Sequence, residues 1–199
     1  IRLRNKITKI VALIVDPYDD FLFEIKVCGI NDEISMNTAL KFKADYVGLV
    51  FYPKSPRNVS INLSKELLRL RNKITKIVAL IVDPYDDFLF EIKKKIKPDY
   101  IQLHGSENPK RCMDIKKKFN IPIIKGVNVK NKLNLMQSTS DFEDICDILL
   151  FDAPSETLPG GNGKKFDWDI LKDFKSKKKW MLAGGLNIEN IEKAIDITK

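Results

Sequence analysis

The sequence has few cysteines and a single histidine, which limits the chemistry it can carry. The three cysteines, Cys28, Cys112 and Cys146, are an odd number at wide and irregular spacing. This pattern is unlike a secreted disulfide scaffold and is typical of a reducing compartment, so we expect a cytoplasmic protein. His104 is the only histidine, and no nucleophile-elbow sequence accompanies it. We therefore expect neither a metal site of the His/Cys type nor a Ser-His-Asp hydrolase.

Long apolar runs are also missing. The longest, Ile10–Val15 and its later twin, end at Asp16 and Asp83, whereas a membrane span needs ~20 apolar residues. No small-residue cleavage site follows the first residues, so they lack the pattern of a signal peptide. The sequence therefore predicts no membrane partner.

Positive charge is in excess, with a formal net charge of +8. Such an excess can indicate a surface that binds nucleic acid. Three lysine triplets, at 93–95, 116–118 and 177–179, each stand late in a helix-like stretch, where cations suit the negative end of the helix dipole. No aromatic residues interleave with them as in a base-stacking surface. We therefore favour solvated helix faces and expect no nucleic-acid partner.

The chain contains an internal repeat, because Arg2–Lys26 recurs letter for letter at Arg69–Lys93. Solenoid repeats diverge and recur more than twice, so the repeat indicates a recent duplication, engineering or an error of sequence assembly. The second copy leads through further lysines into the next expected strand, whereas the first runs directly into another apolar run. We therefore interpret residues 1–25 as a duplicated βα segment, the counterpart of 68–92, and residues 26–199 as the main domain.

Short apolar runs alternate along the chain with amphipathic stretches. The runs are nearly continuous in Val, Ile and Leu, as in parallel strands buried on both faces. This order predicts a parallel α/β fold, either a closed barrel or an open doubly wound sheet, and the lack of a G-x-G-x-x-G motif after the first strand disfavours a dinucleotide-binding sheet. Ser64 and Asn187 have side chains preferred at helix N-caps. The expected strands are Ile10–Val15, Val27–Ile30, Tyr46–Phe51, Ile77–Val82, Tyr100–Leu103, Ile121–Lys125, Ile148–Phe151 and Trp180–Ala183, and the expected helices include Asp32–Phe42, Ser64–Asn72, Asn108–Phe119 and Asp167–Lys175.

Polar groups gather at the carboxyl ends of these expected strands. In a barrel this rim carries the active site. Each group also has a plainer interpretation: the cysteine as a buried hydrophobe, the aspartate as a helix cap, the arginine and histidine as loop residues, and the glycines as a turn. A glycine turn before a helix also offers N–H groups to an anion. The residues concerned are Cys28, Arg57, His104, Asp152, Gly184 and Gly185.

At these positions the chain resembles the phosphoribosylanthranilate isomerase family of tryptophan biosynthesis. Five strings in the family's order carry the resemblance, and the first, second and fourth are specific. They are KVCGI at Lys26–Ile30, ADYVGLVFYPKSPRNV at Ala44–Val59, IQLHGSE at Ile101–Glu107, LLFDAPSETLPGGNGKKFDW at Leu149–Trp168 and MLAGGLNIENIEKAI at Met181–Ile195.

The resemblance implies a (β/α)8 TIM barrel that catalyses an Amadori rearrangement of a small phosphorylated substrate without a metal or organic cofactor. It implies that Cys28 is the general base and Asp152 the general acid. It also implies that Lys26, Arg57, His104, Gly184 and Gly185 bind the substrate, with the arginine on a carboxylate and the glycines on the phosphate. We expect a monomer or a homodimer.

The two catalytic groups have opposite requirements. Cys28 must be available as a thiolate, so it needs a cation nearby, and Lys26 and Arg57 are the candidates. Asp152 must hold a proton near neutral pH, which an apolar setting favours. The preceding run Leu149–Phe151 provides such a setting.

The chain departs from the family at both ends. The family normally begins at about Lys26 and continues beyond Lys199 with an eighth βα unit. We expect the eighth strand to be absent or replaced by Ile10–Val15, which would then pair in parallel with its neighbours. A segment packed outside the barrel is the alternative, because the connection is shorter than the ~10–12 residues of a parallel crossover. In the replaced arrangement Asp16 and Pro17 would face the phosphate and weaken its binding, which leaves a catalytically impaired scaffold as the alternative function.

Overall fold

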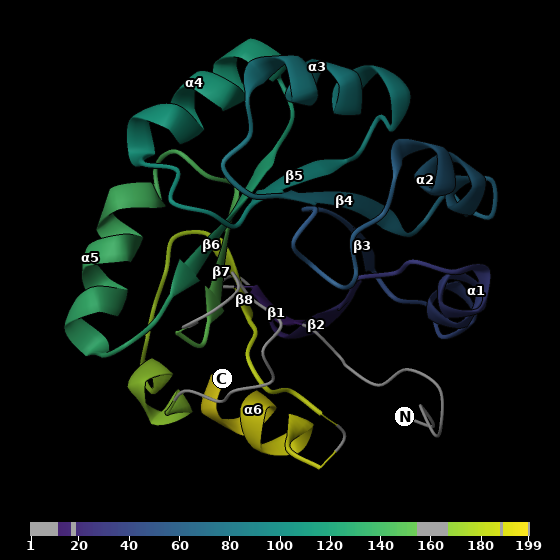
Figure 1. The fold of residues 1–199 in the computed structure, drawn as a ribbon. Helices are drawn as coiled ribbons and strands as arrows, with labels where there is room; N and C mark the ends of the chain where they lie inside the picture. The colour runs from purple at the N-terminus through teal and green to yellow at the C-terminus, as the bar shows by residue number, and fades with distance from the viewer. Residues whose placement is uncertain (1–11, 17–18, 155–166, 188, 199) are drawn as a thin grey trace.

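Eight strands close into a barrel with helices on its outside, as a computed structural model of the chain shows (Figure 1). The structure describes residues 12–16, 19–154, 167–187 and 189–198. The strands are β1 (Ala12–Asp16), β2 (Asp19–Cys28), β3 (Tyr46–Phe51), β4 (Lys76–Ile81), β5 (Tyr100–Leu103), β6 (Ile123–Asn128), β7 (Ile148–Asp152) and β8 (Lys179–Leu182). The helices are α1 (Glu33–Lys41), α2 (Ile61–Leu68), α3 (Asp86–Lys95), α4 (Pro109–Phe119), α5 (Lys132–Phe142), the short 3₁₀ helix η1 (Trp168–Leu171) and α6 (Ile191–Thr198).

The seven strands from β2 to β8 run parallel, each paired with the next. Successive side chains therefore point alternately outward and into the barrel. On β3, Val47 and Leu49 join the large core between strands and helices, whereas Tyr46 and Val50 face the interior. The predicted TIM-barrel class is confirmed. The carboxyl ends of these strands share one rim, which places the candidate residues together.

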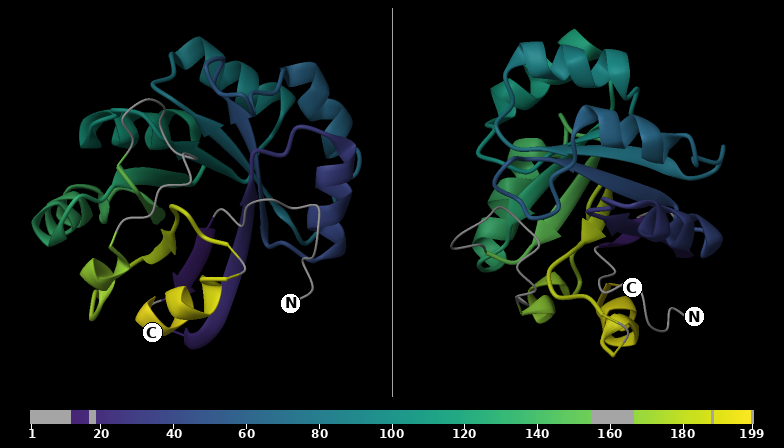
Figure 2. Two further views of the ribbon diagram at one scale, coloured as in Figure 1. Left: turned by 60° about the horizontal axis from the view of Figure 1, so that its bottom comes forward. Right: turned by 45° about the vertical axis from the view of Figure 1, so that its right-hand side comes forward.

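The first copy of the repeat occupies the remaining position in the barrel, as the purple hairpin beside β8 in Figure 2 shows. The replacement of the eighth strand is thus confirmed, but the expected parallel pairing was wrong. β1 pairs antiparallel with both β2 and β8. The reason is the connection, because β2 begins at Asp19, and the two residues after Asp16 suffice only for a hairpin.

The antiparallel direction reverses the expected position of Asp16. Asp16 pairs with Asp19, at the beginning of β2, while Ala12 pairs with Lys26 near its end. Asp16 therefore lies at the rim opposite the carboxyl ends of β2–β8 and does not face the phosphate position. Pro17 and the first two residues of the expected strand Ile10–Val15 lie outside the described residues. The expected reason for weak phosphate binding is therefore removed.

Two local expectations were wrong. Ser64 lies inside α2, and the N-cap is Ser60, whose hydroxyl accepts the N–H of Leu63. The expected helix Asp167–Lys175 is shorter and forms only η1. Lys172 and Asp173 continue in a turn after it, and Asp173 has a positive φ. Asn187 does stand before α6, where its carbonyl accepts the N–H of Ile191.

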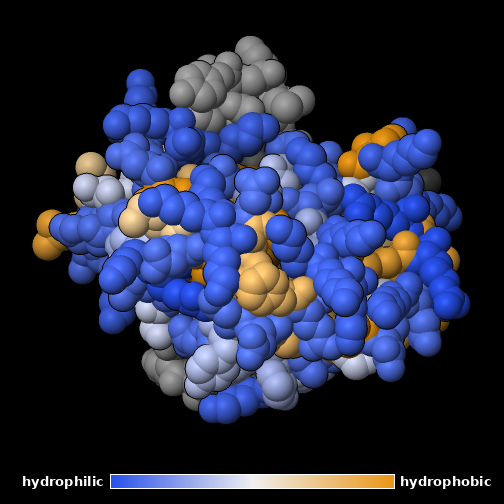
Figure 3. Space-filling model, turned by 90° about the horizontal axis from the view of Figure 1, so that it is seen from above, coloured by the Kyte–Doolittle hydropathy of each residue, from blue (hydrophilic) through white to orange (hydrophobic). Residues whose placement is uncertain are grey.

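Two of the three lysine triplets lie where helix dipoles favour them. The triplets 93–95 and 116–118 form the last turns of α3 and α4. The third triplet does not end a helix, because it leads into β8. Figure 3 shows a mostly hydrophilic face with small apolar patches. None of the helices in the described part of the chain is both long and apolar enough to cross a lipid bilayer.

Candidate active site

Cys28 ends β2 with its thiol inside the barrel. The side chain is buried and packs with Val50 and Leu80. Gly48, its register partner on β3, leaves the space for it, because a Cβ at this position would lie 2.6 Å from Sγ of Cys28. Cys28 is a free thiol. A larger residue in place of the glycine would therefore displace the sulfur.

The side chain of Arg57 crosses the carboxyl end of β2. Arg57 follows β3 in a turn where its N–H donates to Oγ of Ser55. Its side chain lies over Gly29, where φ is 85° and a Cβ would stand 2.4 Å from Cδ of Arg57. Among the described residues the guanidinium has no acidic partner, so this half-buried cation beside Cys28 is free to bind an anion.

Asp152 and His104 meet across the rim. Asp152 ends β7 and is buried, and its Oδ1 accepts the N–H of Ala153 at 2.8 Å. Its Oδ2 lies 3.5 Å from Nε2 of His104, the residue that directly follows β5. The apolar strand before Asp152 is buried as expected. The aspartate is therefore held by one backbone donor and faces one imidazole.

Gln102 fixes the orientation of the imidazole. Its Nε2 lies 2.9 Å from Nδ1 of His104. An amide nitrogen only donates, so Nδ1 is the acceptor. Nε2 is the ring nitrogen that faces Asp152, but at 3.5 Å it has no hydrogen-bond partner among the described residues. Gly126 on β6 makes room for the ring, since a Cβ there would lie 2.3 Å from Nδ1.

The glycine turn after β8 closes the site beside the aspartate. Gly184 and Gly185 have φ of 85° and 71°, a region that suits glycine. A Cβ at Gly184 would lie 2.9 Å from the nitrogen of Ala153 and 3.0 Å from Oδ1 of Asp152. In the described part of the chain the N–H groups of both glycines donate to no protein acceptor. They are therefore available to an anion.

Lys26 lies deeper, two residues before Cys28 and on the same face of β2. Its side chain is fully buried, and its Nζ has no hydrogen-bond partner among the described residues. The layer below it is polar as well: the hydroxyl of Tyr46 donates to Glu24 at 3.3 Å, and burial together with this carboxylate raises the pKa of Tyr46. An unpartnered buried amino group costs stability, which is typical of a group kept for function.

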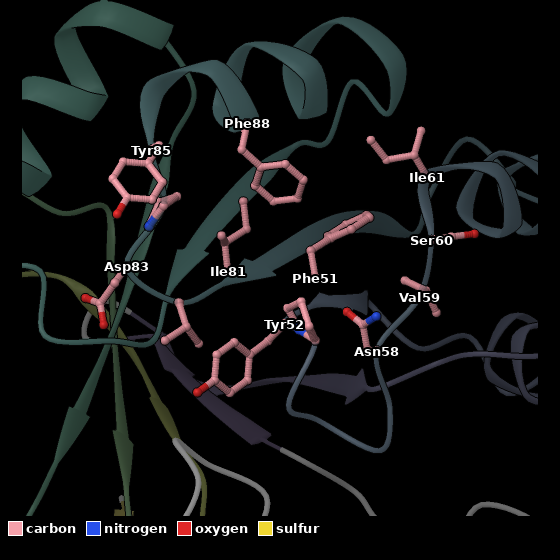
Figure 4. A pocket seen from close by; sticks show the side chains of 13 residues that line it. Phe51, Tyr52, Asn58, Val59, Ser60, Ile61, Ile81, Asp83, Tyr85 and Phe88 are labelled. Atoms are coloured by element: carbon pink, nitrogen blue, oxygen red, sulfur yellow. The ribbon is translucent and has the colours of Figure 1, made fainter.

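A separate cavity of about 500 Å³ opens on the outer side of β3 and β4. Figure 4 shows Phe51, Tyr52 and Phe88 around it, with Asn58 and Asp83 at its edges. None of the residues predicted from the sequence lines it. Tyr52 and Val82 connect the cavity to the site, because both line it and also pack against the cluster of Cys28, Val50 and Leu80. The cavity therefore adjoins the site and is not part of it.

The structure brings the predicted residues to one rim in two groups. Cys28 and Arg57 form one, and His104, Asp152 and Gly184 form the other, with Lys26 below the first. The sequence analysis assigned no role to Gln102 or Gly126. Gln102 stands two residues before His104 in the IQLHGSE string, so strand alternation could have placed it on the same face. The segment 155–166 of the resembling string lies outside the described residues.

No group of three His, Cys, Asp or Glu side chains that could hold a metal ion occurs in the part of the chain that the structure describes.

Comparisons with known proteins agree with this geometry. A family model described as N-(5'-phosphoribosyl)anthranilate (PRA) isomerase matches residues 25–199. The N-(5'-phosphoribosyl)anthranilate isomerase of Paramagnetospirillum magneticum is 40% identical over 178 residues, which are 88% of this chain and 82% of that protein. The enzyme of the same name from Rhizobium johnstonii is 38% identical over 179 residues, with 88% and 80% covered.

Solved structures point to the same family. The phosphoribosyl anthranilate isomerase of Thermotoga maritima matches with a TM-score of 0.77 and 27% identity, covering 87% of this chain and 82% of that one. A second structure, described as the isomerase in complex with reduced 1-(o-carboxyphenylamino)-1-deoxyribulose 5-phosphate, matches with a TM-score of 0.72. The chain therefore belongs to the N-(5'-phosphoribosyl)anthranilate isomerase family and is an isomerase of tryptophan biosynthesis.

Proposed function

We propose that Cys28 and Asp152 are the proton-transfer pair of an intramolecular aldose–ketose isomerisation. The substrate is N-(5-phosphoribosyl)anthranilate, and the product is 1-(2-carboxyphenylamino)-1-deoxyribulose 5-phosphate. The observation that carries the proposal is a thiol and a carboxyl group at the carboxyl ends of β2 and β7, on the interior face of one rim. Two groups that start on different strands can act on different sides of one sugar.

The proposed reaction begins at the acid. Asp152 gives its proton to the furanose ring oxygen, so that the C1′–O bond breaks and a Schiff base forms with the anthranilate nitrogen. The thiolate of Cys28 then removes the C2′ proton, and the electron pair moves to give an enolamine. In the tautomerisation to the ketone, C1′ gains a proton from the Cys28 thiol and the hydroxyl group on C2′ gives its proton to the Asp152 carboxylate, so both groups return to their starting protonation states. No net oxidation or reduction occurs, so these two groups suffice for the proton transfers.

The remaining residues bind the anionic ends of the substrate. Arg57 binds the anthranilate carboxylate, for which its planar fork is well suited, and it lies over Gly29 beside the thiol. The free N–H groups of Gly184 and Gly185 bind the phosphate. His104 stands beside Asp152, with Nε2 3.5 Å from Oδ2, and contacts the substrate next to the acid. Lys26 supplies the positive charge that stabilises the Cys28 thiolate from below.

A direct assay tests the function. The chain is mixed with freshly prepared phosphoribosylanthranilate, and its conversion is followed against the spontaneous decay of the substrate. We expect turnover that saturates with substrate. Decay at the spontaneous rate would overturn the proposed function for this chain.

Arg57→Met is expected to raise KM by about 10–10²-fold, because the loss of a charge-assisted bidentate pair costs about 1.5–3 kcal/mol. Initial rates over a range of substrate concentrations measure the change. Arg57→Lys should restore only part of the affinity, since lysine lacks the fork. An unchanged KM in Arg57→Met would contradict the carboxylate role.

Gly184→Ala is expected to impair both binding and catalysis. The new Cβ would strain a backbone with φ of 85° and press on Asp152 and Ala153. We expect kcat/KM to fall by about 10–10²-fold, the scale of a misplacement of about 1 Å. Steady-state kinetics measures it. An unchanged KM in this variant would argue against the phosphate role.

The oligomeric state belongs to the same proposal. One of the matching structures is described as monomers generated from the dimeric isomerase of Thermotoga maritima. A monomer or a homodimer is proposed for this chain, with the small phosphorylated molecule as its partner. Sedimentation equilibrium separates the two states.

A further inference from the structure

We infer that Glu107 is a positioning residue for the reaction: from outside the barrel it fixes the loops after β4 and β5 and so holds His104 against Asp152. The inference rests on the proposed roles of His104 and Asp152. Glu107 itself lies on the outer side of the strands and does not reach the rim's interior.

Glu107 accepts hydrogen bonds from both loops. Its Oε1 accepts the N–H of Asp83 at 2.8 Å, and its Oε2 accepts the N–H of Gly105 at 3.0 Å. Its side chain is only 2% exposed. A buried carboxylate with these donors fixes the two backbones to each other, because each N–H would otherwise be left without a partner.

Lys125 on β6 completes this anchor. Its Nζ lies 2.7 Å from Oε2 of Glu107 and donates to the carbonyl of Gly105 at 2.9 Å. The ion pair is almost fully buried, at 4% and 2% side-chain exposure. Breaking one partner of such a pair leaves an uncompensated charge, so the anchor is rigid.

His104 is held from both faces of β6. It directly precedes Gly105, and its N–H donates to the carbonyl of Ile81 at 3.0 Å. Outside the barrel Lys125 fixes Gly105, and inside it the next residue, Gly126, receives the imidazole. The anchor thus determines where the imidazole stands relative to β7.

Asp83 is the second residue that the anchor constrains. It has a φ of 45°, which is unfavourable for a residue with a side chain. Its Oδ1 accepts the N–H of Ser106 at 2.8 Å, a further bond between the two loops. Figure 4 shows this aspartate at the edge of the outer cavity. Its strained backbone persists because the bond to Glu107 fixes it.

Glu107→Gln tests the inference. The N–H of Gly105 lies 3.0 Å from Oε2 and 3.3 Å from Oε1 of Glu107, and the ammonium group of Lys125 lies 2.7 Å from Oε2. In the variant an NH₂ group replaces the oxygen that accepts from Gly105 and Lys125, so donor faces donor and the loops separate. We expect kcat/KM to fall by about 10–10²-fold, and we expect the acid limb of the kcat–pH profile to shift, because the contact between His104 and Asp152 changes. Steady-state kinetics across pH measures both effects, and urea unfolding measures the loss of stability that accompanies them.

Asp147→Asn provides the matched control. Asp147 also holds a backbone N–H, that of Ile123 at 2.8 Å, and pairs with Lys116 at 2.9 Å. It does so at the amino-terminal end of the strands, which supports stability rather than catalysis. We expect this variant to lose stability while kcat/KM stays within about twofold of the wild type.

The double variant Glu107→Gln with Lys125→Met separates the pair's charge from its hydrogen bonds. Removing both charges should recover most of the stability lost in Glu107→Gln, while the low kcat/KM and the shifted pH profile should persist. Recovery of activity together with stability would overturn the inference, as would a Glu107→Gln variant with unchanged kinetics. Failure of the wild type to turn over substrate would instead count against the proposed function.

Discussion

Cys28→Ser and Asp152→Asn are each expected to lower kcat by about 10²–10⁴-fold, the contribution of a positioned acid or base. The serine hydroxyl is far less acidic than a thiol, so little of it is available as a base. The asparagine amide has no acidic proton to give. Both changes preserve the size of side chains that are buried on the rim, so the fold should persist.

Binding separates this effect from a structural one. A reduced product analogue should bind each variant with nearly the wild-type Kd, measured by calorimetry. Cys146→Ser is the control, because this buried thiol stands before the amino-terminal end of β7, opposite the rim. If Cys28→Ser kept the wild-type kcat, the thiol would have no part in the proton transfer.

Lys26→Met is expected to make the protein more stable and less active. The amino group is fully buried without a hydrogen-bond partner among the described residues, and an apolar side chain of similar length removes its desolvation cost. We expect the free energy of unfolding to rise by about 1–3 kcal/mol. Activity should fall by about 10–10²-fold, because the variant loses the positive charge that we propose stabilises the Cys28 thiolate.

The repeat supplies a matched control for this prediction. Lys93 is the same residue of the same sequence, but it lies on α3 and donates to the carbonyl of Phe119 at 2.6 Å. Lys93→Met should leave kcat/KM unchanged and should not stabilise the protein. Urea unfolding and steady-state kinetics on both variants measure the contrast. A Lys26→Met variant that is less stable than the wild type would show that the amino group has a partner in solution.

The pattern of apolar runs predicted parallel strands in an α/β fold, with a closed barrel and an open sheet as alternatives, and the family resemblance implied the barrel. Cys28, His104 and Asp152 stand at the ends of such runs, and their shared rim follows from the parallel direction of the strands. Contacts across the barrel could not be derived in this way. The stagger between neighbouring strands decides which side chain orients His104. It also decides that Gly48 and Gly126 lie opposite functional groups and leave space for them.

The repeat separates local sequence from tertiary context most directly. The letters DDFLFEIK form a strand at Asp19–Lys26 and a helix at Asp86–Lys93. In the helix, Leu89 and Ile92 are buried and Glu91 pairs with Lys95 on the surface. In the strand, the corresponding Glu24 accepts the hydroxyl of Tyr46 inside the barrel.

The residues that follow each copy decide between these structures. The first copy continues into Val27 and Cys28, which pair with β3, and a barrel position is free beside β8. The second continues into Lys94 and Lys95, which complete the last turn of α3. The sequence predicted a strand followed by a helix in both copies, which is wrong for the first copy, where the second element is the strand β2. Only the tertiary structure decided whether that element is strand or helix, because burial against neighbouring elements outweighs the small difference in local propensity.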